Sequence, residues 1–517
     1  MRPHDMGTLF DEVAARGTHT TVHLDRPFDI LPTGFGPGVD YTVPQLAGLV
    51  REAAGWLYEL GARRGDRVAV VKRNHYDYDL LACAAVRIGA VPALLSGHLP
   101  DDVLEILLKR LDPAVLVTDR VPPAGLARRV LALRADVPGA ITLDDVRGAR
   151  VPAPRRRRDD DPLVVNHTSG TTGVPKLVVH TGRTLAHRQA RFEAVHRPVI
   201  GVRRDDVVAN AGSYAHVRTF RWTARVFGLA PRRIVLLSDP DPAADVLARH
   251  PPTTVEALPS AYLGWRSLAT RPDNPFRGVR LFVSAYDAVP PPVMRAMLHA
   301  SRRRHPLWVQ TWGQTETGPL TFRFLTRRAL DRAPDARGVG RPVPGRTRLR
   351  VVDPVTFAPL PRGRAGLVLA RTRARCAGYV GEQDRWRAKV TGPWWNTGDL
   401  GVLTRGGSVR LLDREVDAVP GLSCLRAEAL VADRLPGVVE CVVLGPPGRP
   451  PIPVLVTSGP LDSAAWRRAV ADLPPLGDPH VLAWDDVPRT ATGTVRRLDL
   501  LTRLVGSAET RGTGRWT

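Results

Sequence analysis

Hydrophobic and polar positions follow two alternating rhythms along the first part of the chain. Between about residues 42 and 120, stretches with apolar residues three or four positions apart are followed by short unbroken apolar runs. The first pattern is typical of helices packed on one face, and the second of buried strands. It predicts helices in 43–60 and 79–89 and strands in 66–71 and 90–95. Such alternation indicates parallel strands joined by crossover helices.

The same alternation returns after residue 160 and then changes twice. The expected elements are a strand that starts at 163, a helix in 184–195 and strands in 232–239, 279–285 and 306–312. Between 337 and 412, short apolar runs separated by Gly and Pro predict a β-rich subdomain. After residue 413 a shorter pattern predicts helices in 425–435 and 463–473 and strands in 438–445 and 451–458.

We therefore expect an α/β protein of more than one domain, because 517 residues exceed the size at which a single core stops growing. The predicted large N-terminal domain, 1–412, contains two α/β subdomains and the β-rich subdomain. The predicted small α+β domain spans 413–505, and 506–517 is expected to be a disordered tail.

Composition narrows the class of protein. The net charge of +23 comes mostly from Arg residues dispersed over the whole chain, and we interpret it as a coding bias. The one concentrated run, Arg155 to Arg158, is followed by Asp159 to Asp161 and is interpreted as a solvated loop. We therefore expect no nucleic-acid partner. No apolar stretch is long enough for a membrane span and no secretory signal is visible, so we expect a cytoplasmic protein without a membrane partner.

The four cysteines have no spacing typical of a metal site. Cys83, Cys376, Cys424 and Cys441 are scattered, and no two form a C-x-x-C pair. We expect four reduced and mostly buried thiols.

A loop rich in glycine and hydroxyl groups follows the strand predicted at 163. It runs from Thr168 to Lys176 and contains Ser169, Gly170, Thr171, Thr172 and Gly173. Glycines allow successive backbone N–H groups to point at one anion, the hydroxyls add donors and Lys176 adds a charge. The loop lacks the Lys-Ser/Thr pair of a Walker A motif. It predicts a phosphate-binding site at the end of a parallel strand.

This loop resembles the signature of the adenylate-forming superfamily, which includes acyl-CoA synthetases, aryl-acid ligases and adenylation domains of nonribosomal peptide synthetases. Further segments similar to the motifs of that family occur in the family's order: 311–318 (TWGQTETG), 338–345 (GVGRPVPG), 394–401 (WWNTGDLG) and 411–417 (LLDREVD). The resemblance covers nearly the whole chain. It implies an AMP-forming, ATP-dependent ligase whose small domain moves about a hinge at Asp417.

The resemblance also implies roles for individual residues. Trp312, followed by Gly313, would lie against adenine, and Thr315 would contact the α-phosphate. Glu316 would hold the Mg²⁺ that bridges phosphate oxygens. Asp399 would accept the ribose hydroxyls, with Arg414 nearby. ATP and Mg²⁺ are therefore the expected cofactors.

One departure from the family concerns a catalytic lysine. The family normally ends with a Pro-x-Thr-x-x-Gly-Lys segment, whose lysine reaches the reacting carboxylate and α-phosphate. Here Thr494 occupies the lysine position, and the chain has no lysine beyond Lys389. Because an anion attacking a phosphate needs a cation between them, we expect Arg489, Arg496, Arg497 or Lys176 to take over.

A second departure concerns the acyl pocket. Where the family carries small residues at the adenine and acyl turn, this chain has Ala285, Tyr286 and Asp287. Bulk at this turn would shorten the pocket and exclude long fatty acids. His216 occupies a position at which the family places a residue beside the acid. Two nearby arginines, Arg218 and Arg221, would either pair with an anionic substrate or lie on a helix face.

Three hypotheses follow. The first is a ligase that adenylates a small or aryl acid and transfers it to coenzyme A, a carrier-protein thiol or an amine. An alternative form of this hypothesis is a diazotase, because some relatives in the family activate nitrite and transfer it to an arylamine. The second is a relative with impaired adenylation, favoured by Thr494 and opposed by the intact Glu316. The third, a nucleic-acid-binding protein, rests on net charge alone and predicts salt-dependent DNA binding.

Overall fold

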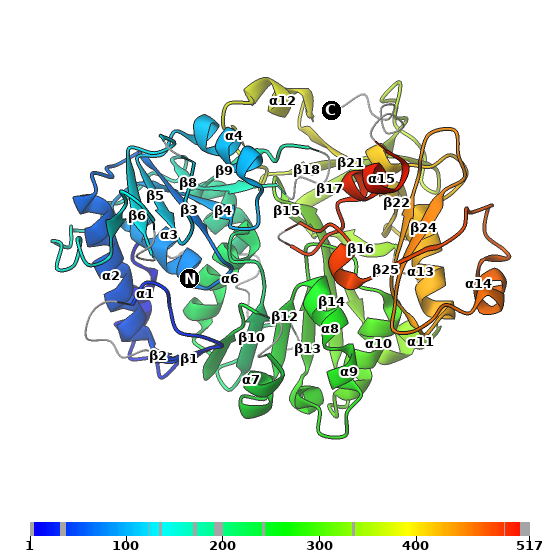
Figure 1. Cartoon of the computed structure of the whole chain (residues 1–517), viewed down its shortest axis with the longest axis horizontal. Helices are drawn as coiled ribbons and strands as arrows, with labels where there is room; N and C mark the ends of the chain where they lie inside the picture. The colour runs from blue at the N-terminus through cyan, green and yellow to red at the C-terminus, as the bar shows by residue number, and fades with distance from the viewer. Residues whose placement is uncertain are drawn as a thin grey trace.

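The computed structural model describes most of the chain and shows three groups of strands. The described residues are 5–31, 38–123, 125–133, 137–168, 173–190, 200–239, 243–332, 337–490 and 492–506. In Figure 1, the first sheet lies in the blue and cyan part, the second extends through the green part, and a small third sheet lies in the orange C-terminal part. The structure confirms the predicted α/β class.

The first sheet has the order β19-β9-β8-β4-β3-β5-β6-β7. Its strands are β3 (Arg67–Lys72), β4 (Val91–Ser96), β5 (Val115–Thr118), β6 (Arg129–Ala132), β7 (Ile141–Thr142), β8 (Pro162–His167), β9 (Leu177–Thr181) and β19 (Gly378–Tyr379). The strands from β8 to β7 pair in parallel, whereas β9 and β19 are antiparallel to their neighbours. The predicted crossover arrangement is therefore present.

The second sheet has the order β17-β18-β21-β22-β16-β15-β14-β13-β12-β10-β11-β1-β2, with β20 beside β21. Its strands are β1 (Thr21–Leu24), β2 (Asp40–Thr42), β10 (Val207–Ala211), β11 (Arg233–Leu236), β12 (Thr254–Ala257), β13 (Leu281–Ser284), β14 (Leu307–Gln314), β15 (Gly318–Leu325), β16 (Gly338–Pro342), β17 (Thr347–Val352), β18 (Ala365–Thr372), β20 (Val390–Thr391), β21 (Trp394–Leu403) and β22 (Val409–Arg414). The β-rich segment is thus joined to the α/β part by the β15–β16 pair.

Helices cover these sheets and pack on them through their apolar faces. They are α1 (Leu9–Ala14), α2 (Val43–Glu59), α3 (Asp77–Arg87), α4 (Asp101–Leu111), the π-helix η1 (Arg183–Ala190), α6 (Val217–Leu229), α7 (Ala243–Arg249), α8 (Pro259–Gly264), α9 (Arg266–Ala269), η2 (Pro275–Gly278), α10 (Pro291–Ala300), α11 (Arg327–Arg332), α12 (Gln383–Ala388) and η3 (Glu415–Asp417). Helix α2 begins at a capping box in which Thr42 and Gln45 bond each other's backbone N–H. Helices α2 and α3 share a core with Val68 and Val70, whereas α4 packs with Ala69 and Val71 on the other face of β3.

The remaining elements form a C-terminal unit, residues 415–506, against one side of the second sheet (Figure 1). They are α13 (Cys424–Arg434), β23 (Val438–Leu444), β24 (Ile452–Thr457), α14 (Ser463–Val470), β25 (His480–Leu482), η4 (Trp484–Asp486) and α15 (Arg497–Val505). Helix α13 lies on α10, where Arg295 contacts Asp433 at 2.9 Å. The predicted tail was 506–517, and of this segment residues 507–517 lie outside the described residues.

Two composition-based expectations can be compared with this structure. All four cysteines are buried and free, as predicted. The interpretation of Arg155 to Arg158 as a solvated loop is wrong for Arg157, which is partly buried and donates hydrogen bonds to the carbonyl oxygens of Gly89, Ala90 and Pro162. Its guanidinium offers several donors in a plane, which suits a cluster of carbonyl oxygens.

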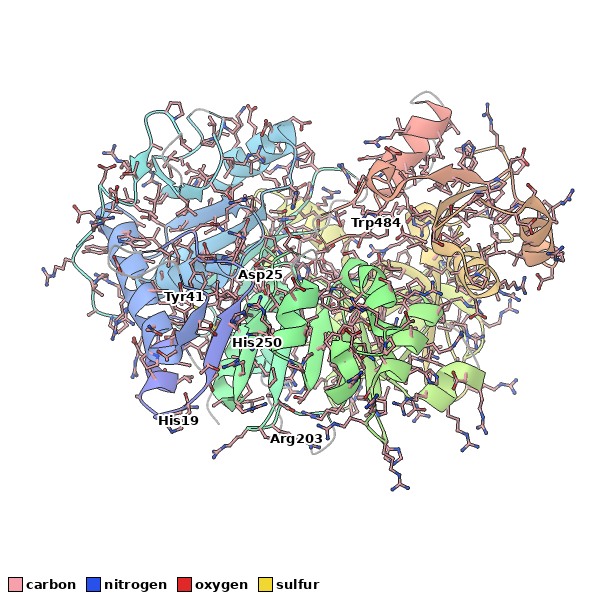
Figure 2. The ribbon with its side chains drawn as sticks, turned by 60° about the horizontal axis from the view of Figure 1, so that its bottom comes forward. His19, Asp25, Tyr41, Arg203, His250 and Trp484 are labelled. Atoms are coloured by element: carbon pink, nitrogen blue, oxygen red, sulfur yellow. The ribbon has the colours of Figure 1, made fainter. Side chains whose placement is uncertain are left out.

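The basic side chains are spread over the surface, as their dispersed positions in the sequence predict. In Figure 2, side chains with nitrogen tips project all around the outline of the molecule. Among the described residues, every helix is too short or too polar to cross a bilayer.

Candidate active site

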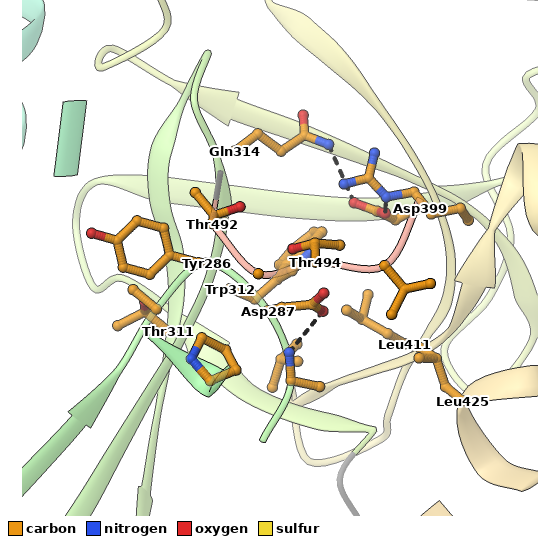
Figure 3. A pocket seen from close by; sticks show the side chains of 18 of the residues that line it. Tyr286, Asp287, Thr311, Trp312, Gln314, Asp399, Leu411, Leu425, Thr492 and Thr494 are labelled. Atoms are coloured by element: carbon orange, nitrogen blue, oxygen red, sulfur yellow. Dashed lines mark hydrogen bonds and ion pairs between the residues drawn. The ribbon is translucent and has the colours of Figure 1, made fainter. Parts of the chain in front are cut away.

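A cavity of about 420 Å³ lies where the second sheet, the Thr168–Lys176 loop and the C-terminal unit meet. Its lining includes residues that follow β10, β12 and β13, at the carboxyl ends of parallel strands, and residues of β14. Ligands of open α/β sheets bind at such ends. Figure 3 shows Thr492 and Thr494 of the C-terminal unit facing Tyr286 and Trp312 across this space.

The Thr168–Lys176 loop is closed at its base. The Thr168 N–H donates to the Lys176 carbonyl at 3.0 Å, and the Lys176 N–H donates to Thr168 Oγ1 at 3.1 Å. His167 holds the same base, because its Nε2 accepts from the Ser96 N–H at 3.1 Å and its Nδ1 then donates to the Thr168 carbonyl at 2.7 Å. Gly173 has a φ of +126°, which only glycine adopts readily.

Both ends of this loop line the cavity, through Thr168, Gly173 and Lys176. The middle of the predicted phosphate loop, Ser169, Gly170, Thr171 and Thr172, lies outside the described residues. Burial lowers the pKa of Lys176 to about 8, against the opposing attraction of Glu316. Three further cations, Lys389, Arg385 and Arg414, lower the pKa in the same direction. Lys176 therefore lies in an electropositive part of the cavity, as an anion site requires.

Glu316 is buried at the turn between β14 and β15. Its Oε1 accepts a hydrogen bond of 2.7 Å from the Tyr379 hydroxyl, and its carbonyl accepts one of 2.6 Å from the Cys376 N–H. The hydroxyl contact leaves Oε2 for another partner. A carboxylate oxygen is the ligand that Mg²⁺ prefers, so the donor set fits this metal.

Thr315 is held from two sides by neutral histidines. His216 caps α6, and its Nδ1 accepts from the Arg218 N–H at 3.1 Å. Burial lowers the pKa of His216 to about 3, so its single proton is on Nε2 and donates to Thr315 Oγ1 at 3.3 Å. The buried His180 donates from Nε2 to the Thr315 carbonyl at 2.7 Å. The Thr315 hydroxyl hydrogen is thereby free to point into the cavity.

Asp399 and Arg414 form a pair on adjacent strands. Arg414 Nε lies 3.0 Å from Asp399 Oδ1, and Gln314 Nε2 donates to Oδ2 at 3.3 Å (Figure 3). Burial raises the pKa of Asp399, whereas the Arg414 charge opposes this change. Gln314 is itself oriented, because it accepts from Trp395 Nε1 at 3.0 Å.

Trp312 and Gly313 lie beside this pair. Trp312 packs in a cluster with Leu320 and Val339 and also lines the cavity. A Cβ at Gly313 would lie 2.1 Å from the Gly318 carbonyl oxygen, so the close approach of β14 and β15 requires glycine here. A flat indole beside a buried carboxylate suits a nucleoside, with the ring for the base and the carboxylate for hydroxyl groups.

Tyr286 fills the turn after β13. Its φ is +79°, a left-handed conformation that is strained for a tyrosine. Its ring centroid lies 4.9 Å from that of His216, and its hydroxyl oxygen would be 3.0 Å from a Cβ on Gly212. Ala285 and Tyr286 both line the cavity, and burial raises the pKa of Tyr286 above its usual range. The side chain therefore occupies part of the cavity wall between His216 and Gly212.

Arg218 and Arg221 lie on helix α6 and are buried, so the alternative that they only decorate a helix face is wrong. Arg218 forms a bidentate pair with Glu256, with distances of 2.6 and 2.7 Å. Arg221 donates to Gln189 Oε1 at 2.6 Å. Both also line the cavity, which keeps the alternative of an anionic substrate open.

The three arginines expected to replace the missing lysine all pair with carboxylates. Arg489 contacts Glu440 at 2.5 Å and stacks on Trp484, Arg496 contacts Asp499 at 2.9 Å, and Arg497 contacts Glu428 at 2.8 Å. Thr494 lies at the end of a tight hairpin, where its carbonyl accepts from the Thr490 N–H at 2.8 Å. Each of these three arginines is therefore already paired with a carboxylate of the C-terminal unit.

Several cavity or supporting residues have no counterpart in the sequence predictions. Tyr379, His180, Gln314, Arg385 and Lys389 support or line the site. For Lys389 the scarcity of lysine was a usable clue, because two of only four lysines in the chain line this cavity. The others depend on pairings between distant segments, such as β9 with β19.

Comparisons with known proteins agree with this geometry. Residues 10–380 match the model of the AMP-binding enzyme family. The chain is 37% identical to the 3-amino-2-hydroxy-4-methoxybenzoate diazotase of Streptomyces cremeus over 97% of this chain and 96% of that protein. It is 27% identical to the 3-aminoavenalumate diazotase of a Streptomyces species over 80% of this chain and 75% of that protein.

The fold also matches solved structures. The ATP-bound MatB of Rhodopseudomonas palustris superposes with a TM-score of 0.77 and 23% identity, covering 97% of this chain and 99% of MatB. At this level of identity the match establishes the fold.

Proposed function

Because this chain belongs to the AMP-binding enzyme family and is an adenylate-forming enzyme, we propose that it is an ATP-dependent diazotase, which activates nitrite and transfers it to an arylamine. Two relatives, both diazotases of aminoaryl acids, support this choice over the ligation of an aryl acid to a thiol. The observation that carries the proposal is the strained Tyr286 in the acyl part of the cavity.

Tyr286 favours a very small oxyanion. Its ring stands beside His216 at 4.9 Å, and its hydroxyl reaches the backbone near Gly212. An aryl carboxylate would have to displace this ring from between its neighbours. Nitrite has three atoms and needs no such displacement. Strain of this kind costs on the order of 1–3 kcal/mol and persists where the surroundings over-determine the conformation, which occurs often at functional sites.

The residues of the cavity suit MgATP. The Thr168–Lys176 loop would hold phosphates, Trp312 would face adenine and Asp399 would accept ribose hydroxyls. Glu316 would hold the metal ion through Oε2, and the bound metal would neutralise phosphate charge. The C-terminal unit would alternate between two poses about Asp417, as the resemblance implies.

The proposed reaction has two group-transfer steps and a final loss of water. A nitrite oxygen attacks the α-phosphorus of ATP, a new O–P bond forms, the bond from the α-phosphorus to the bridging oxygen breaks and pyrophosphate leaves. The amine nitrogen then attacks the nitrosyl nitrogen, an N–N bond forms, the N–O bond breaks, AMP leaves and the amine nitrogen loses one proton. The resulting nitrosamine takes up one proton and loses water, which gives the diazo product as a diazonium.

The side chains around Thr315 would stabilise the first transition state. Because Thr315 Oγ1 accepts from His216, its own hydrogen is available to an oxygen on the α-phosphorus. The low pKa of His216, about 3, keeps the ring neutral at physiological pH. The direction of the hydrogen bond from His216 to Thr315 therefore does not change. Donors that are oriented in advance lower the barrier because they need no reorganisation during the reaction.

The test is a pair of measurements on the purified full-length chain. Nitrite-dependent exchange of labelled pyrophosphate into ATP reports the first step, and mass spectrometry of products formed with an aminobenzoate reports the second. We expect exchange with nitrite, little exchange with benzoate or short carboxylic acids, and a diazo product. Exchange with an aryl acid but not with nitrite would overturn the proposal in favour of a carboxylate ligase.

A further inference from the structure

The cation that adenylation needs must come from outside the C-terminal hairpin. Thr494 replaces the expected lysine, and Arg489, Arg496 and Arg497 are each held by a carboxylate. Other cations line the cavity from the rest of the chain. Arg414 pairs with Asp399, Arg218 pairs with Glu256, and Arg385 contacts Glu382.

Two lysines in the described part of the cavity form no ion pair shorter than 4 Å. Lys176 belongs to the phosphate loop, and Lys389 follows α12, immediately before β20. The Lys389 ammonium lies 3.4 Å from the Asn396 carbonyl oxygen and 5.7 Å from the Trp395 ring centroid. It therefore lies over the turn of β21 that carries Asp399.

Gly398 lies beside this ammonium. A Cβ on Gly398 would be 3.7 Å from Lys389 Nζ, which is an ordinary van der Waals contact, so the glycine is favoured here by its φ of +71° and not by lack of space. The carbonyl of Asn396 accepts one of the three N–H donors of an ammonium, which leaves two donors for a ligand.

The charged residues near Lys389 indicate which part of a bound ATP it would face. Lys389 lines the same cavity as Glu316, Arg414 and Asp399. Burial lowers the pKa of Lys389, and attraction to the carboxylates of Glu316 and Asp399 opposes this change. Glu316 is the residue that suits the metal, and Asp399 is the one that suits the ribose. In a nucleotide the α-phosphate connects the ribose to the metal-bound phosphates. A cation that interacts with both residues is therefore placed to face the α-phosphate.

We propose that Lys389 supplies the positive charge at the α-phosphate that the family takes from the residue at position 494. This cation is fixed beside β21 and does not depend on movement of the C-terminal unit. The proposal rests on the ATP site of the proposed function, and it is independent of whether nitrite or a carboxylate is activated.

The experiment measures nucleotide affinity of the full chain by calorimetry, with ATP and adenosine as separate probes. A charged hydrogen bond to phosphate is typically worth a factor of about 10 to 100, so Lys389→Met is expected to weaken ATP binding by that factor. Adenosine has no phosphate, so its affinity should stay within about twofold. Lys389→Arg should restore most of the ATP affinity because it restores the charge.

Controls separate this role from a structural one. Lys109→Met removes an exposed lysine that pairs with Glu105 on α4 and should leave both affinities unchanged. If Lys389 only supported the turn of Asp399, Lys389→Met would weaken adenosine and ATP equally, which would overturn the proposal. Unchanged ATP affinity would also overturn it. Because neither probe contains nitrite, a failure of the diazotase proposal would appear in the exchange assay and not here.

Discussion

The hydroxyl group of Tyr379 donates a hydrogen bond of 2.7 Å to Oε1 of Glu316. This contact joins β19, which pairs with β9 of the first sheet, to the β14–β15 turn of the second. It therefore orients the carboxylate that faces Lys176 across the boundary between the two sheets.

Removal of this hydroxyl should weaken metal binding more than nucleotide binding. In Tyr379→Phe the ring keeps its place, but Glu316 loses a donor and its carboxylate is no longer oriented. Second-shell partners of metal ligands typically contribute a factor of about 10 to 100 in metal affinity or activity. We expect the Mg²⁺ concentration for half-maximal activity to rise by about tenfold, and a titration with Mg²⁺ at saturating ATP measures it. Tyr58→Phe, on the outer helix α2, is the matched control and should have no effect.

Tyr286 should determine which oxyanion is accepted. Tyr286→Gly removes the ring and relieves the φ of +79°, since glycine adopts this conformation without strain. We expect activity with nitrite to fall and pyrophosphate exchange with benzoate to appear. Tyr286→Phe, which keeps the ring, should retain the preference for nitrite. If the glycine variant keeps the wild-type order of substrates, the tyrosine does not close the acyl pocket.

The affinity for ATP should fall as pH rises through the pKa of Lys176. Burial lowers this pKa to about 8, and the protonated amine is the form that attracts phosphate. ATP binding is therefore expected to be strongest below pH 8 and to weaken above it, by up to about tenfold per pH unit. Calorimetry between about pH 7 and about pH 10, on both sides of this pKa, measures the effect.

Lys176→Arg provides the comparison, because a guanidinium stays charged throughout this range. Burial also lowers the pKa of Lys389, so a shallower decline should remain in the variant. Equal pH profiles for the wild type and the variant would exclude Lys176 as the titrating group.

Local patterns predicted most of the fold. Apolar residues three or four positions apart located helices α2 and α3, and short unbroken apolar runs located strands β3 and β4, within a few residues of their observed bounds. Packing between distant segments was not accessible in this way. The β15–β16 pair, which joins the β-rich segment to the second sheet, depends on the register between Thr321 and Pro342.

The residues of the candidate site also fall into those that local sequence motifs identified and those that depend on packing between distant segments. Residues within compact motifs, such as Glu316 and Asp399, could be named from the sequence because the motifs have a fixed order. For Lys389 the sequence offered only the scarcity of lysine, because its place in the cavity depends on how the segment before β20 packs beside the turn at Gly398. The fate of Arg489 could not be predicted, because its partner Glu440 lies on another strand.

Position 494 offers a test of charge placement. A lysine introduced by Thr494→Lys would enter the cavity on the hairpin that already lines it. In the Lys389→Met background we expect this second substitution to recover at least about tenfold in exchange activity, because one cation replaces another at the same phosphate. Thr492→Lys, two residues away on the same hairpin, is the matched control for added charge. Recovery by both variants alike would show a general electrostatic effect instead of a specific position.

The buried pair of Arg218 and Glu256 should contribute strongly to stability. Both side chains are almost inaccessible, and the pair is bidentate at 2.6 and 2.7 Å. Glu256→Gln removes the negative charge but keeps the shape, so a buried guanidinium loses its counter-charge, which typically costs about 3–5 kcal/mol. We expect a clear fall in the midpoint of thermal unfolding. Asp472→Asn, which breaks the exposed pair with Arg434, should cost less than about 1 kcal/mol. Equal shifts for the two variants would contradict the assignment of Arg218 to a structural pair and would favour its use as a substrate anchor.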